Sequence, residues 1–264
     1  KAEGLGLRAF MHFELLRLFS ESIIQNPNAT GIPYRENYTY QVTPFDPISV
    51  SYDKIIRDFK EAERLLTAHG EYFDRTDENA GGFVKDRVIH MNLYAVQALL
   101  ARVYWEKGDL ETAKNYAMKV IDCPFFLMED KTNVEDIMNG VISDKETIWG
   151  LYSEEFPNYT RNVMYSSGGS YYYDPKPDYR DIYEVDQDGF DYRLDKWFQT
   201  LSDHGAEGLR CMKVVDRFKV RLLTRPVTKL SGINMIRLPE LYYIVAEYYL
   251  VADNMEMAAS YLDK

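Results

Sequence analysis

The chain has 264 residues, of which 46% are apolar, and this is enough to bury a hydrophobic core and argues against a disordered polypeptide. Its formal net charge of −11 makes nucleic acid and anionic lipid unfavourable partners, because an acidic surface repels phosphate groups. Two cysteines, Cys123 and Cys211, are too few for a disulfide framework, and the 4 histidines lack metal-binding spacing, so we expect no metal and no cofactor.

The N-terminal part of the chain predicts two helices separated by a long loop. Apolar residues recur at helical spacing over 5–19 and again over 52–66, where Ser51 is the expected N-cap. Between them, 20–47 contains four prolines and Gly31, which interrupt regular structure. Long loops in compact domains are often functional, so this loop is a candidate binding segment.

The clearest helical pair covers 87–121. Small residues at Ala95, Ala98 and Ala101 let a second helix pack closely, and Gly108 interrupts the pattern between the two helices of the pair.

Helical periodicity fades over 122–237 and returns over 238–264. Within the irregular stretch, 146–152 predicts a short strand, whereas 211–223 fits a strand and a helix equally. A loop rich in Tyr, Ser and Gly covers 158–176.

A shift of 145 residues aligns the two helical pairs. In both copies small and aromatic residues face each other across a tight turn, which is the arrangement of a TPR unit. Asp253 stands where the first copy has Gly108, so we expect a strained or differently shaped second turn. A coincidental match of two amphipathic hairpins is the alternative. The identical pairs are Ala101 with Ala246, Tyr104 with Tyr249, Glu111 with Glu256, Ala113 with Ala258, Tyr116 with Tyr261 and Lys119 with Lys264.

The repeat predicts an all-α fold, a TPR-like helical-repeat α-α superhelix with long loop insertions and minor β structure. Because isolated TPR-like units cannot bury both faces, the pairs must stack on further helices. We expect a single domain over 1–264, with helix pairs over 5–66, 87–121 and 238–264 and a loop-rich insertion over 122–237.

The order of these motifs resembles the SusD/RagB family, whose members are surface nutrient-binding lipoproteins of Bacteroidetes-type bacteria. The resemblance extends over nearly the whole chain, and no single motif carries it. The matching segments are Glu3 to Phe19 (EGLGLRAFMHFELLRLF), Gly31-Ile32-Pro33, Tyr52 to Leu66 (YDKIIRDFKEAERLL), Ala95 to Ile121, Glu146 to Trp149, Tyr183 to Arg193 (YEVDQDGFDYR) and Arg237 to Leu250 (RLPELYYIVAEYYL).

This resemblance implies a TPR-like body at the cell surface, anchored to the outer membrane by an N-terminal lipid. It implies an oligosaccharide or other nutrient as ligand, or a peptide in RagB-like members, and a SusC-like TonB-dependent transporter as partner. The family's lipid-carrying cysteine, opening helix and C-terminal segment have no counterpart here, so we expect a fragment that lacks both termini.

Sugars have apolar CH faces on which aromatic rings stack, while amides and charged groups bind the hydroxyls, so loop tyrosines beside polar residues are candidate ligand contacts. Packing of these loops onto the helices, or contact with the transporter, is the alternative. The candidates in the first loop are Tyr34, Arg35, Asn37, Tyr38 and Tyr40. The candidates in the second stretch are Asn158, Tyr159, Tyr171, Tyr172 and Tyr173, with Trp197 as a neighbour.

Other aromatic and acidic patterns receive structural interpretations. The carboxylates of 184–195 have the rhythm of a calcium loop, but both end positions depart from it, so we expect a plain turn. Aromatic residues at helical spacing are expected to pack helices together: Tyr104, Trp105, Tyr116, Tyr248, Tyr249 and Tyr261.

Non-catalytic binding of oligosaccharide is the leading functional hypothesis. The alternatives are a peptide-binding RagB-like component and a TPR scaffold that binds only protein. No GxSxG motif, P-loop or metal motif supports an enzyme.

Overall fold

The structure is a computed structural model that describes residues 1–68, 85–129, 142–143, 145–160, 183, 197–203, 206–211 and 230–264. The chain forms two compact units. Unit 1 contains Lys1–Met128 and Ile236–Lys264, and unit 2 contains Glu129–Met235.

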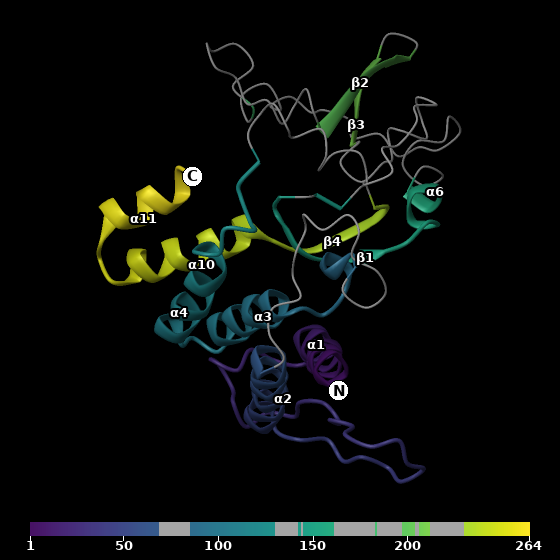
Figure 1. The fold of residues 1–264 in the computed structure, drawn as a ribbon, viewed down its shortest axis with the longest axis vertical. Coiled ribbons are helices and arrows are strands. Elements are labelled where there is room, and N and C mark those ends of the chain that lie inside the picture. The colour runs from purple at the N-terminus through teal and green to yellow at the C-terminus, as the bar shows by residue number, and fades with distance from the viewer. Residues whose placement is uncertain are drawn as a thin grey trace. The chain divides into compact units, whose positions relative to one another are not determined.

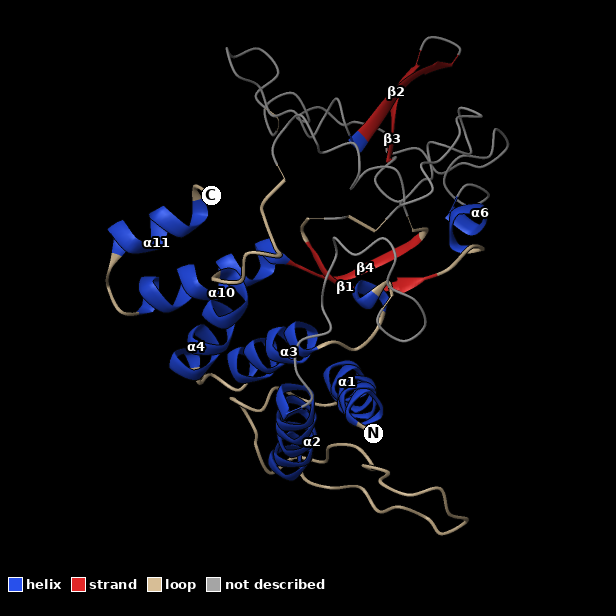
Figure 2. Ribbon diagram, viewed as in Figure 1, coloured by secondary structure: helices blue, strands red, loops and turns tan. Residues whose placement is uncertain are grey.

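Unit 1 is a stack of helices (Figures 1 and 2). Each helix packs on the next along the chain, and α10 packs directly on α4 although a long stretch of sequence separates them. The elements are α1 (Ala2–Phe19), α2 (Ile48–Ala68), the short 3₁₀ helix η2 (Arg87–Ile89), α3 (Leu93–Glu106), α4 (Leu110–Ile121), α10 (Leu238–Val251) and α11 (Met255–Leu262). The predicted TPR-like helical fold is therefore confirmed.

Close packing of α3 follows from its small residues. Ala95, Ala98 and Ala101 are all buried, so neighbouring helices approach the α3 backbone without a bulky side chain between them. Asn92 caps the N-terminus of α3, because its side-chain oxygen accepts a hydrogen bond from the Ala95 backbone N–H at 2.8 Å.

The expected N-cap of the second helix is wrong. α2 begins at Ile48, and Ser51 lies in its first turn, where its hydroxyl donates to the Pro47 carbonyl at 3.1 Å. Ile48 and Ser51 are both buried, and tertiary packing therefore extends the helix one turn earlier than the sequence pattern indicates.

The two copies of the repeat have the same turn, hydrogen bond for hydrogen bond. Asp109 N–H donates to the Tyr104 carbonyl at 2.9 Å, and Asn254 N–H donates to the Tyr249 carbonyl at 2.8 Å. Asp253 has a φ of 58°, in the same left-handed region as Gly108 at 80°. The expected difference in turn shape is therefore absent, since aspartate tolerates this region better than most residues.

The aromatic residues of the repeat pack as expected. Tyr104 stacks on Tyr116 with ring centroids 5.8 Å apart, and Tyr249 stacks on Tyr261 at 5.7 Å. The remaining two residues, Trp105 and Tyr248, also make contacts within unit 1. Trp105 donates its indole N–H to Glu247, and Tyr248 packs edge-on against Tyr249. Their roles are structural.

The described residues form two small sheets, which belong to unit 2 except for the last two residues of β4. β1 (Thr147–Tyr152) pairs with β4 (Gly232–Arg237), and β2 (Phe198–Asp203) pairs antiparallel with β3 (Ala206–Cys211). The strand expected over 146–152 is confirmed as β1. Cys211 ends β3, and the rest of 211–223 lies outside the described residues.

Among the described residues, no helix combines the length and the hydropathy needed to cross a bilayer. In the same part of the chain, His, Cys, Asp and Glu side chains form no group of three or more that suits a metal ion. The calcium-like stretch 184–195 lies outside the described residues.

Candidate functional site

The loop between α1 and α2 is closed at its base by backbone pairing. Gly31 N–H donates to the Asp46 carbonyl at 2.8 Å, and Asp46 N–H donates to the Ile32 carbonyl at 3.3 Å. Glycine is required at residue 31, because a Cβ atom there would lie 2.7 Å from the Ser51 hydroxyl oxygen. The pairing makes residues 33–45, here called the 33–45 loop, project from the helices (Figure 1).

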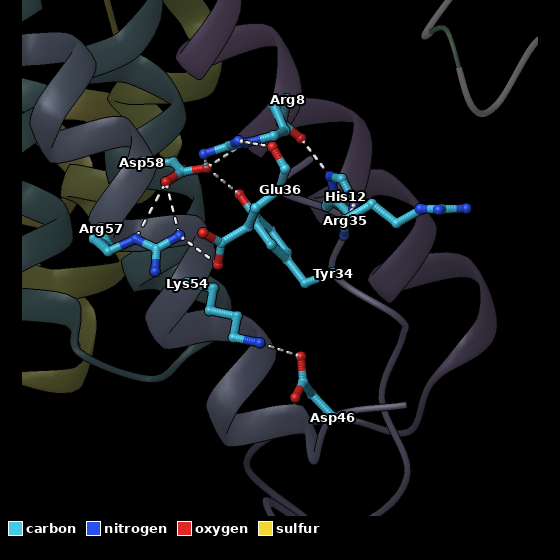
Figure 3. A network of polar contacts seen from close by, with 9 residues as sticks. All are labelled: Arg8, His12, Tyr34, Arg35, Glu36, Asp46, Lys54, Arg57 and Asp58. Carbon is cyan, nitrogen blue, oxygen red and sulfur yellow. Dashed lines mark hydrogen bonds and ion pairs between the residues drawn. The ribbon is translucent and has the colours of Figure 1, made fainter. Parts of the chain in front are cut away.

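A buried carboxylate ties the foot of the 33–45 loop to both helices (Figure 3). Asp58 of α2 accepts hydrogen bonds from the Tyr34 hydroxyl at 2.6 Å and from Nε of Arg8 on α1 at 2.7 Å. Burial raises the pKa of the Tyr34 hydroxyl, and the Asp58 carboxylate raises it further. Tyr34 therefore keeps its proton and acts as a permanent donor.

Two arginines hold Glu36, two residues further along the loop. Arg8 Nη1 donates to the Glu36 carbonyl at 2.9 Å, and Arg57 Nη2 lies 3.0 Å from the Glu36 carboxylate. Burial lowers the pKa of Arg57, but its bonds to Glu36 and Asp58 outweigh that effect and raise it overall. The foot of the loop thus rests on a network of charge-assisted bonds.

His12 of α1 adds a contact on the other side of the foot. Its Nε2 accepts the Arg35 backbone N–H at 3.0 Å, its Nδ1 lies 2.8 Å from the Arg8 carbonyl, and its ring packs 4.1 Å from the Tyr34 ring (Figure 3). His12 and Asp58 thus hold successive residues of the loop.

The tip of the 33–45 loop is open to solvent. Tyr38 and Tyr40 are fully exposed, and Asn37 is exposed beside them. The Arg35 side chain turns along the loop and donates to the carbonyls of Thr39 at 2.5 Å and Gln41 at 3.2 Å. A firmly held foot therefore carries two tyrosine rings with both faces available.

Comparison with known proteins identifies the fold of the chain. No protein-family model matches the chain, and no curated protein matches it. Solved structures do match. A SusD-like carbohydrate-binding protein from Bacteroides vulgatus is 22% identical with a TM-score of 0.70, over 100% of this chain and 53% of that one. The chain has a SusD-like fold.

Two further structures share the SusD-like fold. A SusD superfamily protein from Bacteroides thetaiotaomicron is 20% identical with a TM-score of 0.72, over 100% of this chain and 57% of that one. Surface glycan-binding protein A from Bacteroides uniformis is 14% identical with a TM-score of 0.66, over 99% and 57%. The chain spans about half the length of these structures.

The second candidate stretch of this SusD-like chain belongs to unit 2. Tyr159 lies on the short helix α6 (Phe156–Thr160) and is exposed, while Asn158 is half-buried and donates to the Glu155 carboxylate at 3.2 Å. Trp197 is half-buried next to β2. The three remaining candidates, Tyr171, Tyr172 and Tyr173, lie outside the described residues.

The expectation for Tyr34 needs correction. Tyr34 is 2% exposed, its ring lies against His12 and its hydroxyl is bonded to Asp58, so it cannot offer a ring face to a ligand. It supports the loop instead. Arg35, Asn37, Tyr38 and Tyr40 remain candidate contacts in the first stretch.

Sequence reasoning missed the residues that hold the loop of this SusD-like fold. Asp58 is one helical turn from buried Ile55 and Ala62, so it is a carboxylate at the edge of an apolar face. Such a residue requires donors when the helix packs, and this signal is readable in the sequence. Arg8, which donates to Asp58, and His12, which accepts from Arg35, lie four residues apart on one face of α1, and the sequence marks these two contacts less clearly.

Proposed function

We propose that this SusD-like protein is a non-catalytic glycan-binding protein whose 33–45 loop contacts the sugar. The observation that carries the proposal is the pair Tyr38 and Tyr40, both fully exposed on a loop whose foot is held by Asp58 and His12. Exposed aromatic rings on a fixed support stack on the CH faces of a sugar at low cost in conformational entropy.

Polar groups beside the rings supply hydrogen bonds to sugar hydroxyls. Asn37 is exposed between the foot and Tyr38. The Arg35 guanidinium offers five N–H donors, of which only those on Nη2 face the loop carbonyls. In structures with the same fold the named ligands are carbohydrates or glycans, and this supports a sugar over other small molecules.

We propose further that the protein works at the outer-membrane surface, lipid-anchored, with a SusC-like TonB-dependent transporter that takes up the bound oligosaccharide. The sequence resemblance and the SusD-like fold support this arrangement. Co-purification of a transporter with the protein from its own outer membranes tests it, and recovery of the protein without membranes or transporter would contradict it.

A peptide or protein ligand is the second candidate. Val42 and Phe45 are also exposed on the 33–45 loop, and aliphatic and phenyl groups suit apolar peptide side chains better than sugar hydroxyls. The two candidates therefore differ in which loop residues carry the affinity.

Titration calorimetry against a panel of oligosaccharides tests the leading proposal. Tyr38→Ala and Tyr40→Ala should each weaken the affinity about five- to thirtyfold, because each removes one stacking surface. Tyr243→Ala is the matched control, since Tyr243 is an exposed tyrosine on α10 rather than on the loop, and it should leave affinity unchanged.

Absence of binding to every oligosaccharide, together with tight binding of short peptides, would overturn the glycan proposal. Sensitivity of that peptide binding to Val42→Ser and Phe45→Ser would establish the second candidate.

A further inference from the structure

The two ring nitrogens of His12 have different and fixed roles. A backbone N–H is always a donor, so Nε2, which receives the Arg35 N–H at 3.0 Å, must carry a lone pair. In a neutral imidazole the proton is then on Nδ1, which donates it to the Arg8 carbonyl at 2.8 Å. Only this tautomer satisfies both contacts.

We propose that His12 is a positioning residue for the 33–45 loop. Of its two protonation states, only the neutral one can accept the Arg35 backbone N–H and so help to hold the loop. A proton on Nε2 would set an N–H against the Arg35 N–H, so the bond to the loop is lost. Histidine is the side chain that commonly gains a proton between about pH 5 and 8. Mild acidification should therefore release the loop at Arg35.

Among the described residues at the loop foot, the carboxylates near His12 are already paired with other groups. On α1, Arg8, whose carbonyl lies 2.8 Å from His12 Nδ1, carries a charge of the same sign as an imidazolium. On α2 the acidic group is Asp58, already bonded to Arg8, Tyr34 and Arg57.

Residues 34–36, at the foot of the loop, present three ionisable groups. Glu36 is bound by Arg57, Tyr34 donates to Asp58, and the Arg35 guanidinium turns away toward the loop tip (Figure 3). The carboxylates near the foot are therefore engaged by arginines in the arrangement that holds the loop.

The functional consequence rests on the proposed function, whereas the role of His12 in holding the loop does not. If Tyr38 and Tyr40 contact the sugar, release of Arg35 makes their positions variable, and binding must then order the loop again. Affinity for oligosaccharide should fall on acidification together with the order of the loop.

Hydrogen exchange of the 33–45 amides in the ligand-free protein tests the positioning role. The measured quantity is the protection factor, which corrects for the intrinsic pH dependence of exchange, at about pH 7.5 and about pH 5. In the wild type, protection of the Arg35 amide should fall about two- to tenfold at the lower pH, the effect of losing one hydrogen bond.

Two variants separate the histidine from other titrating groups. In His12→Gln a side-chain carbonyl oxygen takes the acceptor position of Nε2 and does not titrate, so protection should not change between the two pH values. In His12→Leu the acceptor is gone, and protection should be low at both. Equal protection in wild type and His12→Leu at neutral pH, or an equal acid-induced loss in wild type and His12→Gln, would overturn the proposal.

Binding measurements on the same proteins distinguish failure of this inference from failure of the proposed function. If the protection factors follow the expected pattern while Tyr38→Ala leaves oligosaccharide binding unchanged, the loop is held by His12 but does not contact the sugar. If Tyr38→Ala weakens binding while protection is insensitive to His12, the glycan site stands and the positioning role is wrong.

Discussion

Asp58 illustrates how one residue determines the geometry of a distant loop. Its buried carboxylate accepts bonds from α1 through Arg8, from the loop through Tyr34, and from its own helix through Arg57. A carboxylate placed among apolar residues is costly unless such donors surround it. The same requirement that pairs Asp58 therefore fixes where the 33–45 loop leaves the helices.

Tyr52 on α2 should make the free energy of unfolding depend on pH in the alkaline range. Burial, and next the negative charge of Glu106, raise the pKa of Tyr52 from 10.0 to about 12. A tyrosine with a raised pKa holds its proton more tightly in the folded state. Its contribution to stability is fully present below pH 10 and is lost as the pH rises toward 12.

We therefore expect Tyr52→Phe to lose less stability than the wild type between about pH 9 and about pH 12, by about 1–2 kcal/mol. Urea unfolding at a series of pH values measures this difference. Parallel curves for the two proteins would show that Tyr52 does not titrate with an altered pKa.

At the scale of elements, the helix–turn–helix repeat shows how strongly a local pattern specifies local structure. Asp109 caps α4 and Asn254 caps α11, each by accepting a backbone N–H three residues later at 3.1 Å. Gly108 and Asp253 occupy the same left-handed position before these caps. Two different residues thus occupy the same position of the turn, and the left-handed backbone conformation is less favourable for aspartate than for glycine.

The cost difference gives a paired prediction. Gly108→Ala should destabilise the protein by about 1 kcal/mol, since a Cβ there meets only Ile24 at an ordinary 3.5 Å and the penalty comes from the backbone conformation. Asp253→Gly should stabilise α10–α11 by about 0.5 kcal/mol for the same reason. Thermal melts followed by circular dichroism measure both, and shifts of equal sign would contradict the equivalence of the two turns.

At the scale of the whole molecule, unit 1 joins segments far apart in the sequence. Arg102 of α3 donates two hydrogen bonds to Glu240 of α10, at 2.5 and 2.7 Å, and α10 also packs on α4. Burial lowers the pKa of Arg102, but the bonds to Glu240 and the charge of that carboxylate outweigh it and raise the pKa overall. This ion pair links the two copies of the repeat.

We expect Glu240→Gln to cost about 1–2 kcal/mol, because a neutral amide then replaces the carboxylate that accepts both bonds from the buried guanidinium, and Glu14 lies farther from it, at 3.7 Å. Glu61→Gln is the matched control, since Glu61 also accepts two bonds from one arginine, Arg64, but on the exposed face of α2. It should cause no measurable change. Urea unfolding compares the variants, and equal effects would show that burial of the Arg102 pair adds nothing.

Local patterns in the sequence account for most of what could be predicted. Helical periodicity, small residues such as Ala98, and the repeat itself identify α3, α4, α10 and α11, because helices and tight turns depend on residues three or four positions apart. The sequence pattern also marks the polar, aromatic stretch of the first loop. It misplaces the start of α2, because burial of Ile48, rather than a capping residue, determines where that helix begins.

The division of roles within that first loop required the tertiary structure. Tyr34 and Tyr38 are equivalent by residue type and neighbourhood, yet one is buried and the other fully exposed. The difference arises because Asp58, 24 residues from Tyr34, and His12, 23 residues from Arg35, meet the loop only after α1 and α2 pack together. By itself the sequence determined which segments are helices and which loop is aromatic. Contacts between distant residues decided which ring supports the loop and which rings face the solvent.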